Sequence, residues 1–504
     1  MNLSRLHHRC ILIAVAFAIL LLTAPSLAQS APPVPVVVPV SPVSSASVGA
    51  SDPGDTAWML ISSALVMLMV PGLALFYAGM VRRKNVLGTM MHSMAALGII
   101  GVEWVVLGYA MAFGKSWHGL IGWDWNLLFL KGITPDLIHS GTRVPELVFV
   151  MFQGMFAIIT PALISGAFAE RVKFSAFAVF TLLWGIIIYN PLAHWVWGGG
   201  WLGGGEGHIG AIDFAGGTVV HISAGVSALI TALYIGKRAG YPKHVLQPNS
   251  LVLTLLGAGL LWFGWFGFNG GSASASNGSA ALAFTTTQIA AAAGGMAWTI
   301  AEWFKHGRPT SMGFASGLVA GLVAITPASG FVPPWAALVI GGIAGVACYV
   351  AVVMKGKMGY DDSLDAFGVH GVGGFIGAIL TGVLAVKLFG GTAGLVDGDA
   401  GQVWRQAIAA LSAAGFAAIG TIFLVVLVDK TIGFRVSAAV ETEGMDVGIH
   451  GEQGWMLEAL SVPAVELPGD QSDRPQRRPE QKTVVFAKPD KAAEKPSEKT
   501  AAKV

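Results

Sequence analysis

Long apolar segments separated by short polar breaks follow one another along most of this chain from Asp55 onward. Each segment is about as long as the roughly 20 residues that an α-helix needs to cross a bilayer. We count eleven of them, so the pattern predicts an all-α polytopic membrane protein with eleven transmembrane helices. The approximate ranges are 56–81, 86–113, 146–169, 174–192, 213–236, 249–269, 279–303, 311–328, 334–354, 363–386 and 404–429.

The fifth and tenth segments are less uniformly apolar than the others and are rich in glycine. The fifth contains D-F-A-G-G-T-V-V-H, from Asp213 to His221, and the tenth contains D-S-L-D-A-F-G-V-H, from Asp362 to His370. The acid and the histidine of the second copy each lie 149 positions beyond their counterparts in the first. Matched copies at this spacing predict one functional site to which both parts of the chain contribute.

The distribution of Lys and Arg predicts the orientation of the helices, because basic residues collect in cytoplasmic loops. Alternate breaks, starting after the first helix, hold most of these residues, including the groups at 82–84, 237–243 and 305–308. We therefore expect the N-terminus outside and the C-terminus inside (N-out/C-in). The fifth and tenth helices then run in opposite directions. This indicates an inverted 5+5 repeat plus one extra helix, with the site near the midplane between the two halves.

The composition agrees with a membrane protein. Hydrophobic residues make up 54% of the chain and charged residues only 12%, whereas soluble domains carry about 25% charged residues. Residues 1–28 have a basic start, a short apolar run and a Ser-Leu-Ala end, which predicts a cleaved signal peptide; an uncleaved first helix is the alternative. Cleavage removes Cys10 and leaves Cys348, so we expect neither an intrachain disulfide nor a cysteine metal cluster.

The segments outside the helical domain, which we place at 55–430, differ in composition. Residues 29–54 are rich in proline and predict an exported leader without a fold of its own. Residues 431–462 begin with a run dense in charge and glycine, which predicts a cytoplasmic C-terminal segment that is folded or able to dock. Residues 463–504 cannot bury a core, and we expect a disordered tail.

His221 and His370 are the first candidates for chemistry, because an ionisable side chain inside a membrane segment is a functional candidate by default. A neutral imidazole offers one hydrogen-bond donor and one acceptor without a fixed charge, so two in line could pass a small polar molecule or a proton. The alternative is that both histidines bond to backbone carbonyls at helix breaks. Their matched positions favour a pore.

The acids of the two copies are better interpreted as structural. On a helix, an offset of eight residues is a rise of about 12 Å, so Asp213 would not reach His221, nor would Asp362 reach His370. Asp365 is also more than a turn from His370. We expect Asp213, Asp362 and Asp365 to lie near helix starts, where a carboxylate accepts hydrogen bonds from free backbone N–H groups. A metal site would need more ligands at closer spacing.

Aromatic residues complete the candidate site. Phe152 and Phe156 are four residues apart on the third helix, Trp197 follows the fourth, and Phe268 and Ser272 lie at the outer end of the sixth. From position alone these residues are interpreted as packing and interface anchors. A cation-binding role is the alternative, because rings can hold a cation with a hydroxyl as one acceptor.

Several motifs together resemble the ammonium transporter/methylammonium permease/Rhesus family, and in particular its bacterial ammonium transporters. They are D-F-A-G-G-T-V-V-H, W-F-G-F-N-G-G-S, G-A-F-A-E-R-V-K-F, L-V-A-I-T-P-A-S-G, D-D-S-L-D-A-F-G-V-H-G-V-G-G and the C-terminal R-V-S, E-G-M-D and H-G-E. The resemblance covers about residues 52–455. The C-terminal G-M-D and H-G-E-Q-G-W depart slightly from the usual form.

The resemblance implies a homotrimer in the inner membrane, with one narrow hydrophobic pore per subunit. It implies that Phe156, Trp197 and Ser272 recruit ammonium on the outer side and that Phe156 and Phe268 close the entrance, with Phe152 and Gln153 nearby. His221 and His370 then line the pore, and Asp213, Asp362 and Asp365 are structural acids. It also implies a regulatory role for the C-terminal segment, with docking by a cytoplasmic P-II protein.

The predicted function is ammonium transport, in which NH4+ loses a proton near the entrance and neutral NH3 crosses the apolar pore. Membrane lipid surrounds the protein, and we expect no enzyme activity, cofactor, metal or nucleic-acid partner. Two alternatives remain. One is an ammonium sensor with the same fold, and the other is a passive Rhesus-type gas channel, against which Trp197 and Ser272 stand as a recruitment pair for a charged ligand.

Overall fold

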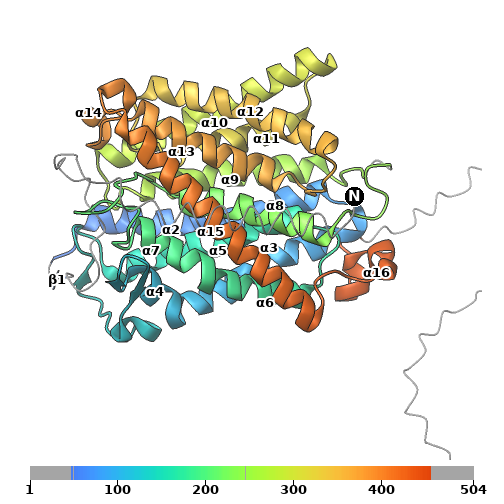
Figure 1. Cartoon of the computed structure of the whole chain (residues 1–504), viewed down its shortest axis with the longest axis horizontal. Helices are drawn as coiled ribbons and strands as arrows, with labels where there is room; N and C mark the ends of the chain where they lie inside the picture. Colours follow the sequence, from blue (N-terminus) through green and yellow to red (C-terminus); the bar gives the residue numbers. More distant parts are fainter. Residues whose placement is uncertain (1–46, 49, 244–245, 456–504) are drawn as a thin grey trace, which may run out of the picture. The chain divides into compact units, whose positions relative to one another are not determined.

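The computed structural model describes residues 47–48, 50–243 and 246–455, and most of these residues are helical (Figure 1). The predicted signal peptide, most of the leader and the predicted tail lie outside the described residues. Each of the eleven predicted ranges contains a helix.

The first part of the described chain forms seven α-helices. They are α2 (Pro53–Met80), α3 (Val86–Glu103), α4 (Tyr109–Phe113), α5 (Glu146–Phe168), α6 (Phe174–Trp184), α7 (Asn190–Val196) and α8 (Ser223–Ile235). Short 3-10 or π-helical turns precede or join them at η3 (Arg83–Asn85), η4 (Trp104–Gly108), η5 (Trp125–Leu130), η6 (Gly185–Tyr189) and η7 (Gly217–Ile222).

The rest of the described chain forms a second series of helices. They are α9 (Leu251–Gly271), α10 (Gly278–His306), α11 (Ser311–Ile325), α12 (Pro334–Met358), α13 (Val372–Leu384), α14 (Lys387–Gly390), α15 (Gly401–Ile432) and α16 (Ala438–Glu443). The accompanying turns are η8 (Phe367–Gly371), η9 (Leu395–Asp397) and η10 (Asp446–His450).

Nine helices within the described residues are long and apolar enough to cross a membrane. Two of the eleven predicted spans, which form α10 and α11, are not among them. The α10 sequence is rich in alanine, threonine and glycine, which lowers its hydropathy, and α11 has only 15 residues. The chain is therefore a multi-pass membrane protein, and the count of eleven spans remains a prediction.

Within the described residues, two small antiparallel sheets accompany the helices. Strand β2 (Lys115–Trp117) pairs with β3 (Ile121–Trp123), and β1 (Ser47–Val48) pairs with β4 (Leu137–Ile138). Two residues at the end of the predicted leader thus pair with β4, and the leader as a segment without a fold of its own stays a prediction. Asp52 adds to this, because its carboxylate caps α2 and forms an ion pair with Arg143 at 2.7 Å.

Glycines allow the main helix pairs to approach closely, which suits a membrane interior where close packing replaces the hydrophobic effect. Helix α2 packs along α9, where a Cβ on Gly257 would lie 2.3 Å from the backbone N of Phe76. Helices α10, α11 and α12 form a second group, drawn in yellow and orange in Figure 1. Here a Cβ on Gly321 would lie 2.1 Å from Ala290 O.

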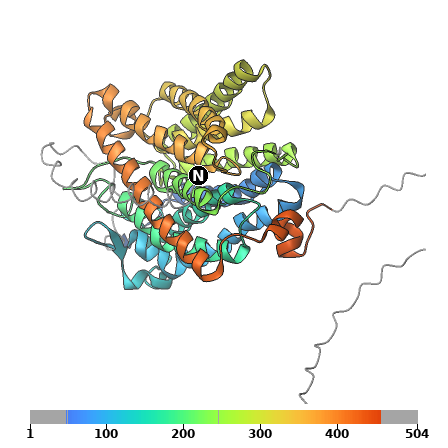
Figure 2. The same cartoon turned by 45° about the vertical axis from the view of Figure 1, so that its right-hand side comes forward.

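Helix α15 packs against a different set of helices. Figures 1 and 2 both show it running obliquely across its neighbours, and it contacts α13, α8 and α6. The described part of the C-terminal segment then packs against the start of α3. Asp446 accepts a hydrogen bond from Gly88 N at 2.8 Å, and Met445 N donates to Asn85 Oδ1 at 2.8 Å.

A buried cluster of charges lies at the ends of α5 and α8 and before η8. Arg238 bridges Asp361 at 2.8 Å and Glu170 at 3.3 Å, and Arg171 contacts Asp361 at 2.9 Å. Burial alone would raise the pKa of Glu170, but Arg238 and Arg82 lower it below its ordinary value overall. The pKa of Asp361 is lowered in the same way, with Arg238 and Arg171 outweighing burial.

Candidate functional site

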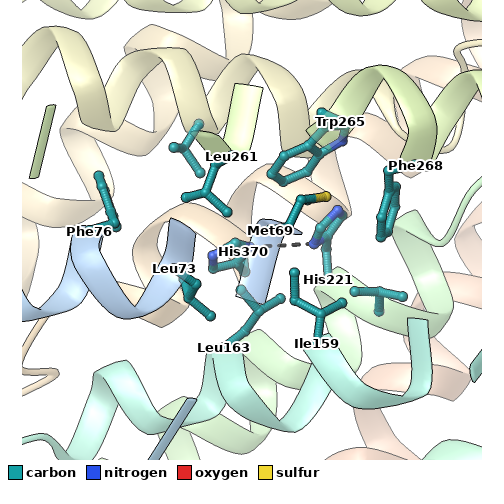
Figure 3. Close-up of a pocket in the computed structure, with 12 residues that line it drawn as sticks. Met69, Leu73, Phe76, Ile159, Leu163, His221, Leu261, Trp265, Phe268 and His370 are labelled. Atoms are coloured by element: carbon teal, nitrogen blue, oxygen red, sulfur yellow. Dashed lines mark hydrogen bonds between the residues drawn. The ribbon is translucent and has the colours of Figure 1, made fainter. Parts of the chain in front are cut away.

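The two predicted histidines meet in the interior. His221 Nδ1 lies 3.4 Å from His370 Nδ1, the ring centroids are 5.4 Å apart, and the planes are inclined by 25° (Figure 3). Both side chains are buried, with 1% and 4% exposed. A hydrogen bond between two Nδ1 atoms requires one donor and one acceptor, so it forms only when one of these two atoms carries a hydrogen and the other does not.

Local structure brings the histidines together. Each occupies a π-helical turn, His221 in η7 and His370 in η8, and such turns are frequent at functional sites. The supporting helices cross at Gly225 and Gly371, where a Cβ on Gly225 would lie 2.1 Å from Gly371 N. Only glycine at this crossing allows the two turns to approach so closely.

Asp213 holds the start of the first turn. Its carboxylate accepts backbone N–H groups from Gly216 at 2.8 Å, Gly217 at 2.7 Å, Thr218 at 2.7 Å and Val219 at 3.3 Å. Our predicted span began at 213, but the helical turn begins at Gly217 because Gly216 has φ 110°, outside helical conformation. Asp213 therefore precedes the helix and caps it.

The two acids of the second copy differ from one another. Asp362 accepts hydrogen bonds from Ala366 N at 3.0 Å and Phe367 N at 2.8 Å, at the start of η8. The Asp365 carboxylate instead forms an ion pair with Lys355 Nζ. Our expectation that Asp365 also bonds to free backbone N–H groups is therefore wrong; its backbone has φ 61° and its side chain faces a lysine.

The predicted aromatic residues form a continuous row that leads to the histidines. Trp197 meets Phe156 edge to face at 6.1 Å between centroids, and Phe156 stacks on Phe268 at 4.0 Å with planes inclined by 19°. Phe268 in turn lies 6.1 Å from His221, and Phe152 lies 4.9 Å from Phe156. Residues from five separate segments thus line up from Trp197 to His370.

Polar contacts hold the Trp197 end of this row. Trp197 Nε1 donates to the Asp213 carbonyl at 2.9 Å, so Asp213 contacts both the indole and the turn that its carboxylate caps. Ser272 Oγ donates to Phe268 O at 2.9 Å, which leaves the hydroxyl oxygen able to accept. Gln153 Oε1 has no hydrogen-bond partner within the part of the chain that is described.

A narrow cavity surrounds the histidine pair (Figure 3). Its volume for a water-sized molecule is ≈ 10 Å³, which is about one water position. Apart from the two imidazoles its walls are almost entirely apolar. The lining residues are Met69, Leu73, Phe76, Ile159, Leu163, Val220, His221, Leu261, Trp265, Phe268, Val319 and His370.

Sequence reasoning missed most of this lining. Trp265 stacks near His221, with centroids 5.5 Å apart, and its Nε1 donates to Thr326 Oγ1 at 2.9 Å. Its spacing of three residues from Phe268 placed it on the same helix face, which was a usable signal. Met69, Leu73 and Phe76 come from α2, where the sequence does not distinguish a pore-lining apolar side chain from any other.

Among residues 47–48, 50–243 and 246–455, no group of three or more His, Cys, Asp or Glu side chains could hold a metal ion.

Comparison with known proteins places this chain in a family. The sequence model of the Ammonium Transporter Family matches residues 57–455. The chain belongs to this family. The ammonium transporter of Bacillus subtilis (strain 168) is 46% identical over 405 residues, which are 80% of this chain and 98% of that relative. The ammonium transporter of Aquifex aeolicus (strain VF5) is 48% identical over 408 residues, which are 81% of this chain and 94% of that relative.

Solved structures support the same family assignment. The crystal structure of Saccharomyces cerevisiae Mep2 superposes with a TM-score of 0.71 at 36% identity, covering 77% of this chain and 88% of Mep2. A sensor Amt protein gives a TM-score of 0.72 at 31% identity, covering 78% of this chain and 97% of its own. In this member of the ammonium transporter family, the ring row and the histidine pair both lie within the matched residues 57–455.

Proposed function

We propose that this protein transports ammonium along the row of rings from Trp197 to His370. The observation that carries the proposal is that this row ends in two buried, contacting imidazoles within an otherwise apolar cavity. NH4+ is recruited at the outer aromatic end, loses a proton near the entrance and crosses as NH3.

Recruitment uses Phe156, Trp197 and Ser272. The two rings meet at 89°, so a cation can lie against the face of one ring while the other packs at its edge. The Ser272 oxygen, which still has acceptor capacity, takes one N–H of the ion. Cation–π attraction of about 2 kcal/mol in a desolvated site then adds to a hydrogen bond.

Deprotonation follows from the energetics of the pore. An unpaired ion in an apolar medium costs up to tens of kcal/mol, which the recruitment contacts cannot offset. NH4+ therefore divides into NH3, which keeps the electron pair of the broken N–H bond, and a proton, which follows a separate route that involves the imidazoles. K+ has no proton to give up, so the same barrier excludes it.

The stacked pair Phe156 and Phe268 acts as the gate. With their centroids 4.0 Å apart, the rings leave no room between them, so passage requires one ring to move. Beyond the gate, His221 and His370 provide a neutral donor and acceptor for NH3 where the remaining lining is apolar. Asp213 and Asp362 support the two histidine turns, and Asp365 holds Lys355 beside the second.

The wider architecture is part of the same proposal. It consists of eleven spans oriented N-out/C-in in the inner membrane, an inverted 5+5 repeat and a homotrimer surrounded by lipid. The matched residue positions of the two capped histidine turns support the repeat. The packing of the described C-terminal residues against α3 supports a regulatory segment at 431–462 that a P-II-type protein could reach.

A second candidate function is ammonium sensing, which the likeness to a sensor Amt protein favours. A third is passive conduction of ammonia gas. The three functions differ in charge movement, because only transport that separates NH4+ at the entrance yields a saturable current specific for ammonium.

The test is current from purified protein in liposomes under an ammonium gradient, with a potassium gradient as the ionic control. We expect a saturable ammonium current that is absent with potassium. Fast ammonia flux without current would favour the gas channel, and neither flux nor current would favour the sensor.

Two variants test the assigned residues. His221→Ala should change the current or its ion selectivity while the protein remains folded, and an unaltered current would remove the pore role of His221. Trp197→Leu should raise the ammonium concentration needed for half-maximal current. Trp125→Leu is the matched control, because Trp125 is 73% exposed and lies outside the ring row.

A further inference from the structure

A buried acid lies outside the histidine pore. Glu103 is at the junction of α3 and η4, inside a candidate membrane span, and only 3% of it is exposed. Its Oε1 accepts a hydrogen bond from Asn190 Nδ2 at 2.7 Å. Asn190 is fully buried and follows the π-helical turn η6, so two π-helical turns border this pair. Because π-helical turns are rare and frequent at functional sites, two of them beside Glu103 and Asn190 mark this pair for closer inspection.

Two oxygen atoms of this pair lack partners. Neither Glu103 Oε2 nor Asn190 Oδ1 has a hydrogen-bond partner among the described residues. If Glu103 is ionised, both atoms are acceptors and neither can donate to the other. A buried carboxylate without a cation is also costly, and no ion pair within the described chain includes Glu103.

No donor among the described residues lies within hydrogen-bond distance of either free oxygen. A Cβ on Gly108 would lie 3.0 Å from both carboxylate oxygens, and one on Gly185 would lie 3.6 Å from Oε2. The Met111 sulfur lies 3.8 Å from Asn190 Nδ2. The neighbouring titratable group of η6 is Tyr189, whose buried hydroxyl also lacks a partner in the described structure and carries no positive charge.

We propose that Glu103 and Asn190 form a proton-binding site. One proton forms an O–H bond with Glu103 Oε2 and is donated to Asn190 Oδ1, while Asn190 Nδ2 donates to Oε1. The result is a cyclic acid–amide pair. A single proton from water thereby satisfies both unpaired oxygens and removes the buried charge. The site is separate from the histidine pair and does not depend on the proposed pore mechanism.

The direct test is infrared spectroscopy of the full-length protein in lipid at neutral pH. We expect a C=O stretching band of a protonated carboxylic acid, which is absent in Glu103→Gln. Glu206→Gln is the matched control, because Glu206 is exposed in a loop and should lose only carboxylate absorption. A Glu103→Gln spectrum that loses carboxylate absorption instead would overturn the proposal.

Two further measurements keep the proposal testable if Glu103→Gln does not fold. Selective ¹³C labelling of glutamate in the unaltered protein should reveal a protonated glutamate, and its absence would contradict the site. Asn190→Leu removes the donor to Oε1, so the C=O band should move to higher frequency. A band at its original frequency in a folded Asn190→Leu protein would show that Asn190 is not the partner.

Discussion

The crossing of Gly225 with Gly371 offers the sharpest test of how the fold positions the histidines. In Gly225→Ala the new Cβ would lie 2.1 Å from Gly371 N and 2.3 Å from Gly371 Cα. Ordinary van der Waals contact begins at 3.4 Å. The difference, 3.4 Å less 2.1 Å, means that the two segments must separate by about 1.3 Å.

The expected consequences follow from that separation. Overpacking a tight interior costs about 1–3 kcal/mol, and we expect the upper end because the clashing atoms are backbone and cannot rotate away. Gly225 lies one helical turn after His221, and Gly371 directly follows His370. The Nδ1–Nδ1 distance of 3.4 Å is already at the long end for a hydrogen bond, so a further ångström of separation should break the histidine contact.

Thermal unfolding in lipid or detergent, together with ammonium current in liposomes, checks this expectation. Gly225→Ala should unfold at a lower temperature and conduct poorly. Gly98→Ala is the matched control, because no atom lies within 4 Å of its added Cβ. If Gly225→Ala keeps both the unfolding temperature and the current of the unaltered protein, the close crossing does not position the histidines.

Two other predictions concern supports of the site. Gln406 on α15 accepts a hydrogen bond from Ile212 N at 2.7 Å and donates to Ile212 O at 2.7 Å, next to Asp213. Gln406→Leu leaves two backbone groups unpaired, at a cost of about 1–3 kcal/mol each. It should therefore raise the ammonium concentration needed for half-maximal current. An unchanged concentration would show that Gln406 does not support the site. The second concerns pH. The pKa values of Glu170 and Asp361 are lowered in the folded protein, so their stabilisation is present above the ordinary values of 4.5 and 3.8 and is lost as the pH falls below them. The unfolding temperature should therefore fall on acidification through that range, and less so in Glu170→Gln; equal pH profiles would contradict the assignment. At neutral pH, Arg238→Met should destabilise the protein by about 3–5 kcal/mol because it leaves buried acids short of a cation, whereas Lys237→Met, at an exposed neighbour, should change little.

The helices were predictable because hydropathy is a local property. A run of about 20 apolar residues must satisfy its backbone internally in a membrane, and a helix does so within the segment. Each of the eleven predicted ranges accordingly contains a helix. The weakest cases were 279–303 and 311–328, where small residues replace larger apolar ones because other helices pack against them closely.

The candidate site was predictable where the sequence repeats or matches family motifs. Asp213 and His221 have counterparts at the same spacing in Asp362 and His370, which indicated a shared site before any contact was known. Asp365 has no such counterpart in the first copy, and it is the acid whose contacts we predicted wrongly. A sequence repeat therefore predicts the role of residues that occur in both copies, and gives no information about residues that occur in only one.

By itself the sequence determined that the chain spans a membrane and where its helices lie, and it singled out His221 and His370 as candidates, because each of these depends on composition or spacing along the chain. The tertiary structure alone decided the distance between His221 and His370, the stacking of Trp265 beside them and the pairing of Glu103 with Asn190. These contacts join residues from separate helices. They depend on helix crossings whose closeness is set by glycines such as Gly225 and Gly371, and the partner of a glycine cannot be identified from its place in the sequence.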